Sequence, residues 1–135
     1  FDGVLREAGI DLADRIYYAG GSALGKGREL AQEMLSRHDD LDFLYFSNDM
    51  IAAGGLLYCI EQGLDIPGKM GLAGFNAVEI LDGLPMQLAT MDTRRREIGE
   101  AAARIVAARV AGEPCDEIIT LDSGFDPGQT MRDAP

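Results

Sequence analysis

The feature that most constrains this chain is a regular alternation of short apolar segments with longer amphipathic ones. The apolar runs, such as Phe43-Leu44-Tyr45-Phe46, contain no interleaved polar residues. Such runs are typical of strands that are buried on both faces of a parallel sheet. Because helical segments separate them, the pattern predicts an α/β protein built on a doubly wound parallel sheet.

The spacing of apolar residues and of turn residues places the individual elements. Glycine ends helices in the left-handed conformation, and Pro67-Gly68 is typical of a turn. A helix that ends before Gly9 opens the chain, and no cap precedes it, so we expect the chain to be part of something longer. We predict strands over 16–19, 42–46, 70–75, 88–91 and 117–122, and helices over 24–37, 49–62 and 94–111.

Composition narrows the possible partners. The chain has 135 residues, the size of one domain, and a formal charge of −11 from 23 acidic and 12 basic side chains. An acidic surface opposes direct contact with nucleic acid. No apolar run approaches the roughly 18 residues that would indicate a membrane span, so we expect no membrane partner.

Cysteine content and motif content argue against several chemistries. Cys59 and Cys115 are too few for a disulfide framework or a metal site, which favours a reducing, cytoplasmic setting. The chain has no HExxH, no CxxC, no nucleophile elbow and no carboxylate pair that we could place for acid–base catalysis. We therefore predict no catalytic residue, no metal, no cofactor and no enzymatic activity.

Polar residues gather where the predicted strands end, which is where open α/β sheets bind ligands. Ser22 follows the first strand, and Ser47, Asn48 and Asp49 follow the second. One of the latter three is expected to cap the next helix, which leaves the others free for another role. Asn48 is the main ligand-binding candidate, because an amide both donates and accepts, as a sugar hydroxyl does.

Two further strand ends carry candidate residues. Asn76 follows the strand over 70–75 and is either a ligand contact or an ordinary Asx turn. The run Thr93-Arg94-Arg95-Arg96 opens a helix, where positive side chains oppose the macrodipole. Either these arginines are solvated, or one of them receives a carboxylate or phosphate beside the free helical amides.

A family resemblance rests on several motifs together. The stretch FSNDMIAAGGLLYCIEQGLDIPGKMGLAGFN resembles the signature of the LacI/GalR transcriptional repressors, and LATMDTRRREIGEAA with TLDSGFDPGQTM is similar to the gluconate-repressor-like subgroup. The resemblance implies a type I periplasmic-binding-protein-like lobe that binds an effector. It implies that 1–92 and 113–135 form the C-terminal lobe, and that 93–112 is a crossover and helix belonging to an N-terminal lobe otherwise missing here.

The same resemblance assigns roles to individual residues. It implies ligand contacts at Asn48, Asn76, Thr93 and Arg95, with Arg95 holding the carboxylate of a gluconate-like sugar acid. Asn76 stands where most members have aspartate, and loss of that charge suits an anionic ligand. A homodimer is also expected, through an apolar patch for which we name Leu56, Ile80, Leu81 and Leu84.

These residues lead to a function and two alternatives. We predict the ligand-sensing and dimerisation region of a repressor, which reaches operator DNA only through an N-terminal headpiece that this chain lacks. A periplasmic sugar- or solute-binding protein of a transport system shares the fold, so the fold alone does not separate the two. An enzyme with its catalytic residues elsewhere is the other alternative.

Overall fold

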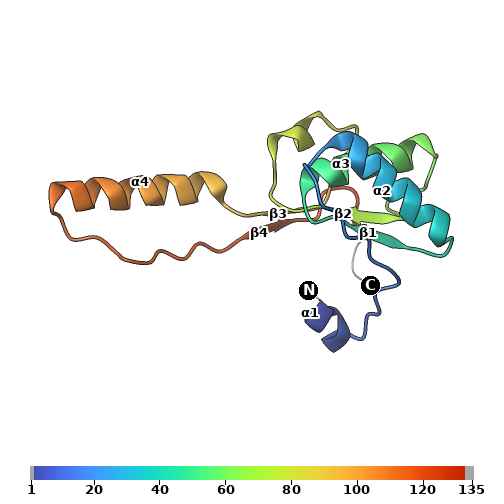
Figure 1. Ribbon diagram of the computed structural model, residues 1–135, viewed down its shortest axis with the longest axis horizontal. Helices are drawn as coiled ribbons and strands as arrows, with labels where there is room; N and C mark the ends of the chain where they lie inside the picture. Colours follow the sequence, from blue (N-terminus) through green and yellow to red (C-terminus); the bar gives the residue numbers. More distant parts are fainter. Residues whose placement is uncertain (1, 133–135) are drawn as a thin grey trace.

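The computed structural model describes residues 2–132 and places the helices close to their predicted positions. Figure 1 shows two long helices together over a small sheet, and a third projecting away from it. The helices are α1 (Asp2–Glu7), α2 (Leu24–Arg37), α3 (Asp49–Glu61), the 3-10 helix η1 (Glu79–Gly83) and α4 (Arg95–Ala111). The strands are β1 (Phe43–Tyr45), β2 (Gly71–Ala73), β3 (Thr90–Asp92) and β4 (Gly124–Asp126).

The sheet is parallel where the apolar strands predicted it to be. β1 pairs with β2 in parallel, with Leu44 opposite Leu72. A parallel bridge between Ala73 and Ala89 continues this order toward β3, and β4 then pairs with β3 in the antiparallel direction. The α/β architecture with a parallel sheet is therefore confirmed, and β4 adds an antiparallel edge.

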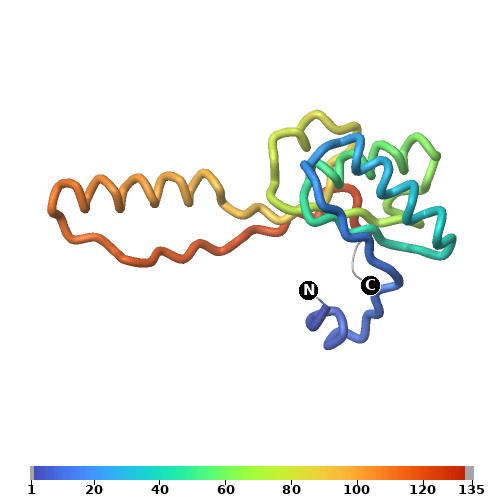
Figure 2. The backbone as a smooth tube through the Cα atoms, in the orientation of Figure 1, coloured from blue at the N-terminus to red at the C-terminus, as the bar shows by residue number. Residues whose placement is uncertain are grey.

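Two predicted strands are wrong. Residues 16–19 and 117–122 have no strand pairing in the part of the chain that the structure describes. Residues 113–123 instead return alongside α4, away from the sheet, as the tube in Figure 2 makes clear. A strand exists only where a neighbour exchanges backbone hydrogen bonds with it, and apolar composition does not reveal that neighbour.

Glycines let the two long helices approach closely. A Cβ on Gly27 would lie 2.0 Å from the carbonyl oxygen of Ile51, and one on Gly54 would lie 2.0 Å from that of Leu24. Gly27 and Gly54 thus allow the backbones of α2 and α3 to pack closely. The α2–α3 pair covers one side of the sheet (Figure 1), while Phe43 and Tyr45 remain exposed. Among the described residues, β1 is therefore covered on one face only, whereas the sequence predicts burial on both faces.

The core lies between the α2–α3 pair and the sheet. Leu56, Leu72 and Leu88 have no exposed surface, and Ala31 and Leu44 pack with them. Burial at the centre of this cluster gives Leu56 no surface with which to meet a partner. The prediction that Leu56 belongs to a dimer interface is therefore wrong, because this position on α3 faces the sheet.

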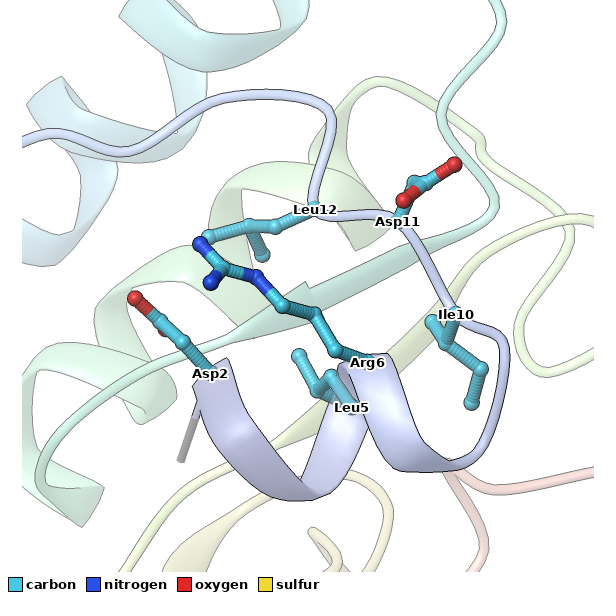
Figure 3. Close-up of a pocket in the computed structure, with 6 residues that line it drawn as sticks. All are labelled: Asp2, Leu5, Arg6, Ile10, Asp11 and Leu12. Carbon is cyan, nitrogen blue, oxygen red and sulfur yellow. The ribbon is translucent and has the colours of Figure 1, made fainter.

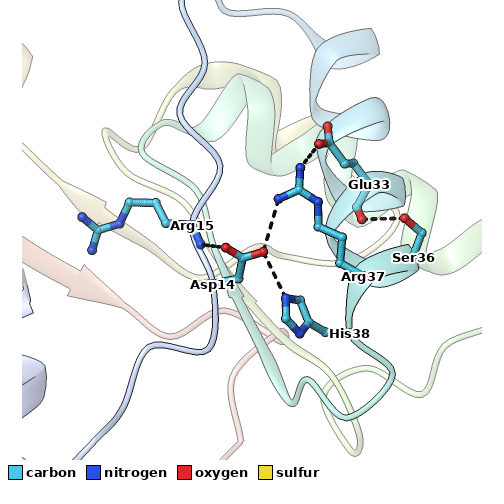
Figure 4. A network of polar contacts seen from close by, with 6 residues as sticks. All are labelled: Asp14, Arg15, Glu33, Ser36, Arg37 and His38. Carbon is cyan, nitrogen blue, oxygen red and sulfur yellow. Dashed lines mark hydrogen bonds and ion pairs between the residues drawn. The ribbon is translucent and has the colours of Figure 1, made fainter.

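An ionic network fastens the segment before α2 to the end of that helix (Figure 4). The Asp14 carboxylate lies 3.0 Å from His38 Nε2, and it accepts hydrogen bonds from the Arg15 backbone amide and the Arg37 guanidinium. These contacts, that of His38 first, lower the pKa of Asp14 from 3.8 to about 2. The carboxylate is thus held as an anion beside the C-terminal turn of α2, where positive side chains are favoured.

The projecting helix α4 exposes apolar side chains. Ile98, Val106 and Val110 are 51%, 61% and 84% exposed, and Ala101 is the one residue of α4 that is buried. Ala102 is also exposed, while Ile105 is half-buried. No helix among residues 2–132 is long and apolar enough to cross a membrane.

Candidate functional site

Asn48 is the N-cap of α3. Its side-chain Oδ1 accepts from the backbone amide of Ile51 at 3.1 Å, which satisfies one of the free donors of the first helical turn. The same oxygen accepts a hydrogen bond from Ser22 Oγ at 2.8 Å. Capping is therefore confirmed as one role of Asn48. Since Oδ1 serves both contacts, the amide nitrogen of Asn48 is the group that remains to donate to a ligand.

Asp49 has a different role from its neighbour. It has no exposed surface, and its carboxylate lies beneath the loop that follows β2. Oδ2 accepts from the amide of Val78 at 3.0 Å, and Oδ1 accepts from the hydroxyl of Thr90 at 2.8 Å. Gly74 makes room for this carboxylate, because a Cβ there would lie 2.3 Å from Asp49 Oδ1.

Asn76 lies at the tip of that loop with a positive φ of 109°. The prediction of an ordinary Asx turn is wrong, because the amide two residues on, that of Val78, donates to Asp49 rather than to the Asn76 side chain. The Asn76 side chain makes no hydrogen bond to another described residue. Its amide therefore has unused donors and acceptors, and the ligand contact at Asn76 stays a prediction.

The three arginines at the start of α4 differ in their partners. Arg94 lies 3.5 Å from Asp92 and 3.7 Å from Glu97, and Arg96 bonds to Glu100 at 3.0 Å. Arg95 instead donates from Nη2 to the carbonyl oxygen of Ala77 at 3.1 Å. Among the described residues, Arg95 is thus the member of the run without a carboxylate partner.

The start of α4 also leaves backbone donors unused. Its N-cap, Arg94, has a left-handed backbone and makes no side-chain cap hydrogen bond. Thr93 Oγ1, just before it, is buried and has no hydrogen-bond partner among the described residues. A buried hydroxyl without a partner is uncommon. The donors at this helix start that suit an anion are the Arg95 side chain and the backbone amides of the first turn.

The structure brings four of the five predicted residues into two groups, while the Thr93 hydroxyl has no hydrogen-bond partner among the described residues. Ser22 contacts Asn48, and Arg95 contacts the loop that carries Asn76. Asp49, which adjoins Asn48 and bonds that loop, connects the groups, and sequence reasoning did not single it out. Its position directly after Asn48, at the end of an apolar strand, was the available signal.

Two hollows of the surface lie away from these residues. One, of about 270 Å³, lies between α1 and the residues that follow it (Figure 3), where Arg6 points between Asp2 and Leu12. The other, of about 520 Å³, lies between η1 and β4, near Leu84. Neither hollow includes Ser22, Asn48, Asn76, Thr93 or Arg95 in its lining.

Comparison with known proteins places the chain in a family. A model of the periplasmic binding protein-like domain matches residues 1–127. The transcriptional regulator IdnR of Escherichia coli is 36% identical over 77% of the chain, and the regulator GntR of Pseudomonas aeruginosa is 31% identical over 78%. These matches span 31% and 30% of the relatives, so the chain corresponds to about a third of their length.

A solved structure gives the same result. The crystal structure of a LacI family transcriptional regulator from Silicibacter pomeroyi superposes with a TM-score of 0.90 at 59% identity. It covers 96% of this chain, which in turn covers 40% of that protein. The chain therefore belongs to the periplasmic binding protein-like domain family, in the form that LacI-type transcriptional regulators carry.

Proposed function

We propose that this chain is the ligand-sensing part of a LacI-type transcriptional repressor and that its ligand is a small sugar acid of the gluconate type. The observation that supports a sugar acid as the ligand is the position of Arg95, whose guanidinium has no carboxylate partner among the described residues. Arg95 belongs to the first turn of α4, which has no side-chain cap, and follows Thr93, whose hydroxyl has no hydrogen-bond partner among the described residues. Such a group of donors favours a carboxylate.

The amides of Asn48 and Asn76 supply the rest of the site. The amide nitrogen of Asn48 can donate to a sugar hydroxyl, and the Asn76 amide can both donate and accept. Neither adds a negative charge, which would repel an acid. Ser22 orients Asn48 through its hydrogen bond to Oδ1 and lies close enough to offer its own hydroxyl.

Ligand binding would act on transcription through the arrangement of two lobes. The sequence predicts that 1–92 and 113–135 belong to one lobe and 93–112 to the other. Because residues 113–123 return alongside α4, we propose that they accompany 93–112. The exposed apolar residues of α4 support a partner lobe on that helix. A ligand held by Asn48 on one side and Arg95 on the other favours one arrangement of the lobes by its differential affinity. DNA contact would come through a headpiece outside this chain, in the cytoplasm, with no catalytic step.

Replacing Arg95 by alanine tests the ligand class. Loss of a charge-assisted hydrogen bond removes about 1.5 to 3 kcal/mol, so the affinity of the full-length protein for gluconate should fall about 10- to 100-fold. Isothermal titration calorimetry measures the change. Arg96→Ala removes the same charge one residue along, from a side chain that is 88% exposed, and should leave the affinity unchanged. Equal affinities for Arg95→Ala and wild type would refute the assignment.

A homodimer would use the short helix η1 and the residue that follows it. Leu81 and Leu84 are half-buried and pack partly on the core, and Ile80 is half-buried beside them. An apolar patch of this kind suits an isologous contact. Ile80→Asp should shift the full-length protein from dimer to monomer in sedimentation velocity, whereas a dimer that persists would place the interface elsewhere.

A further inference from the structure

The loop between β2 and η1 has a backbone that its own residues do not favour. Asn76 and Ala77 both have positive φ, 109° and 51°, a conformation that side chains with a Cβ rarely adopt. Two such residues in succession persist only when the surroundings determine the backbone on several sides. The loop therefore needs an external support, and its position in the proposed ligand site gives that support a functional consequence.

Three successive amides of this loop each have a partner outside it. The amide of Asn76 donates to the Met91 carbonyl at 3.0 Å, that of Ala77 to Thr90 Oγ1 at 3.2 Å, and that of Val78 to Asp49 Oδ2 at 3.0 Å. The last two partners also bond each other, because the Thr90 hydroxyl donates to Asp49 Oδ1 at 2.8 Å.

This support is well shielded from water. Asp49 has no exposed surface and Thr90 is 3% exposed. The backbone amide of Asp49 adds a fourth connection, since it donates to the Phe75 carbonyl at 3.1 Å, at the near end of the same loop. A buried carboxylate and hydroxyl that meet several donors form a rigid unit, because any movement would leave a polar group without a partner.

The loop passes its geometry on to Arg95. The Ala77 carbonyl accepts the hydrogen bond from Arg95 Nη2, so the direction of that carbonyl decides where the guanidinium stands before a ligand arrives. The backbone of Asn76 decides where its side-chain amide points. The proposed ligand contacts of Arg95 and Asn76 thus both depend on the φ and ψ angles of the loop at Asn76 and Ala77.

We infer that Asp49 and Thr90 are positioning residues for the ligand, which hold the loop at Asn76 and Ala77 in its left-handed form and thereby set Arg95 in place. The inference rests on the ligand site proposed above. Neither residue touches the ligand. They hold the Arg95 guanidinium and the Asn76 amide in the geometry for binding before the ligand arrives. Less conformational entropy is therefore lost when the ligand binds.

The chain offers a matched control for the test. Thr130, which has no exposed surface, also bridges two strands through its hydroxyl, accepting from the Ala89 amide at 2.8 Å and donating to the Leu72 carbonyl at 2.7 Å. Its bridge touches neither the loop nor Arg95. Thr90→Val and Thr130→Val therefore each remove one buried hydroxyl with two hydrogen bonds, and Thr90→Ser restores the first.

The experiment compares these three variants of the full-length protein with wild type. Calorimetry with gluconate gives affinity, urea unfolding gives stability, and NMR hydrogen exchange without ligand gives the protection of the Ala77 and Val78 amides. We expect both valine variants to lose similar stability. Thr90→Val alone should lose affinity, at least about tenfold, and protection at Ala77, while Thr90→Ser stays within about twofold of wild type.

The outcomes separate this inference from the proposed function. Equal losses of affinity in Thr90→Val and Thr130→Val would mean that Thr90 acts only through overall stability, and would overturn the inference. If wild type binds neither gluconate nor its 6-phosphate nor a ketogluconate, the proposed ligand class fails by itself, and the exchange data then decide the inference. Unchanged protection of Ala77 in Thr90→Val would overturn it, and a loss confined to that variant would support it.

Discussion

Replacing Gly54 by alanine is expected to lower the free energy of unfolding by about 3 kcal/mol, the upper part of the range for overpacked cores. The added Cβ would stand 2.0 Å from the Leu24 carbonyl oxygen, and the facing Cα is that of Gly27, so the atoms in the way are backbone atoms of α2. A helix backbone cannot rotate aside as a side chain can. The α2–α3 pair must therefore separate, which also disturbs the core beneath it.

A control within the same pair of helices separates crowding from helix propensity. Gly25 also lies in α2, but nothing stands within 4 Å of a Cβ placed there. Gly25→Ala should therefore leave stability unchanged or raise it by up to about 1 kcal/mol, since alanine favours the helix. Urea unfolding followed by circular dichroism measures both variants, and a Gly54→Ala protein as stable as Gly25→Ala would contradict the close-packed crossing.

Replacing Asp49 by alanine is the second change with a large expected effect, also about 3 kcal/mol of lost stability. It leaves the Val78 amide and the Thr90 hydroxyl without their acceptor at a position where Asp49 has no exposed surface and Thr90 is 3% exposed. Unsatisfied buried donors lose the hydrogen bonds that they make to water in the unfolded chain. The loop with positive φ at Asn76 and Ala77 loses its support at the same time.

Two further variants sharpen this prediction. Asp49→Asn keeps one oxygen as an acceptor and turns the other position into a donor, so it should lose less stability than Asp49→Ala. Asp40→Ala removes a carboxylate from an exposed turn and should change stability by less than about 0.5 kcal/mol. Thermal unfolding of the three proteins gives the order. Equal stabilities of Asp49→Ala and Asp40→Ala would show that the buried carboxylate does not support the loop.

The helices could be predicted from the sequence because their signals are local. Gly9, Gly63 and Gly112 all have the left-handed φ that helix ends favour, as their positions after apolar periodic segments indicated. Asn48 was likewise recognisable as a cap because it directly precedes a helix. In each case the residue and the element that it ends or begins are neighbours along the chain.

Local signals could not show that the strands predicted over 16–19 and 117–122 do not form. Residues 16–19 are wholly apolar and aromatic, and 117–122 contain two isoleucines and a leucine. Strand formation also requires a partner in space, and residues 113–123 return alongside α4 at a distance from the sheet. The position of β4 shows the reverse case. Gly124–Asp126 is hardly apolar, yet it pairs with β3 because the chain returns there.

For the candidate site too, local features could be predicted from the sequence and long-range contacts could not. The approximate positions of the ligand-binding residues were predictable, because ligand sites of this fold class lie at strand ends. The choice of Arg95 among three arginines depends in part on long-range geometry, because its partner Ala77 is 18 residues away, whereas Arg96 has a partner one helical turn on, at Glu100. The pairing of Asp49 with Thr90, 41 residues apart, leaves no local pattern at all.

The central claim is that the site receives a sugar acid, and a calorimetric titration of the full-length protein tests it most directly. The ligands are gluconate, its 6-phosphate, a ketogluconate and, as the neutral sugar, ribose. We predict saturable binding of one of the acids and no detectable heat of binding for ribose. Tight binding of ribose with the acids silent would contradict the account and return Arg95 to the role of a surface residue.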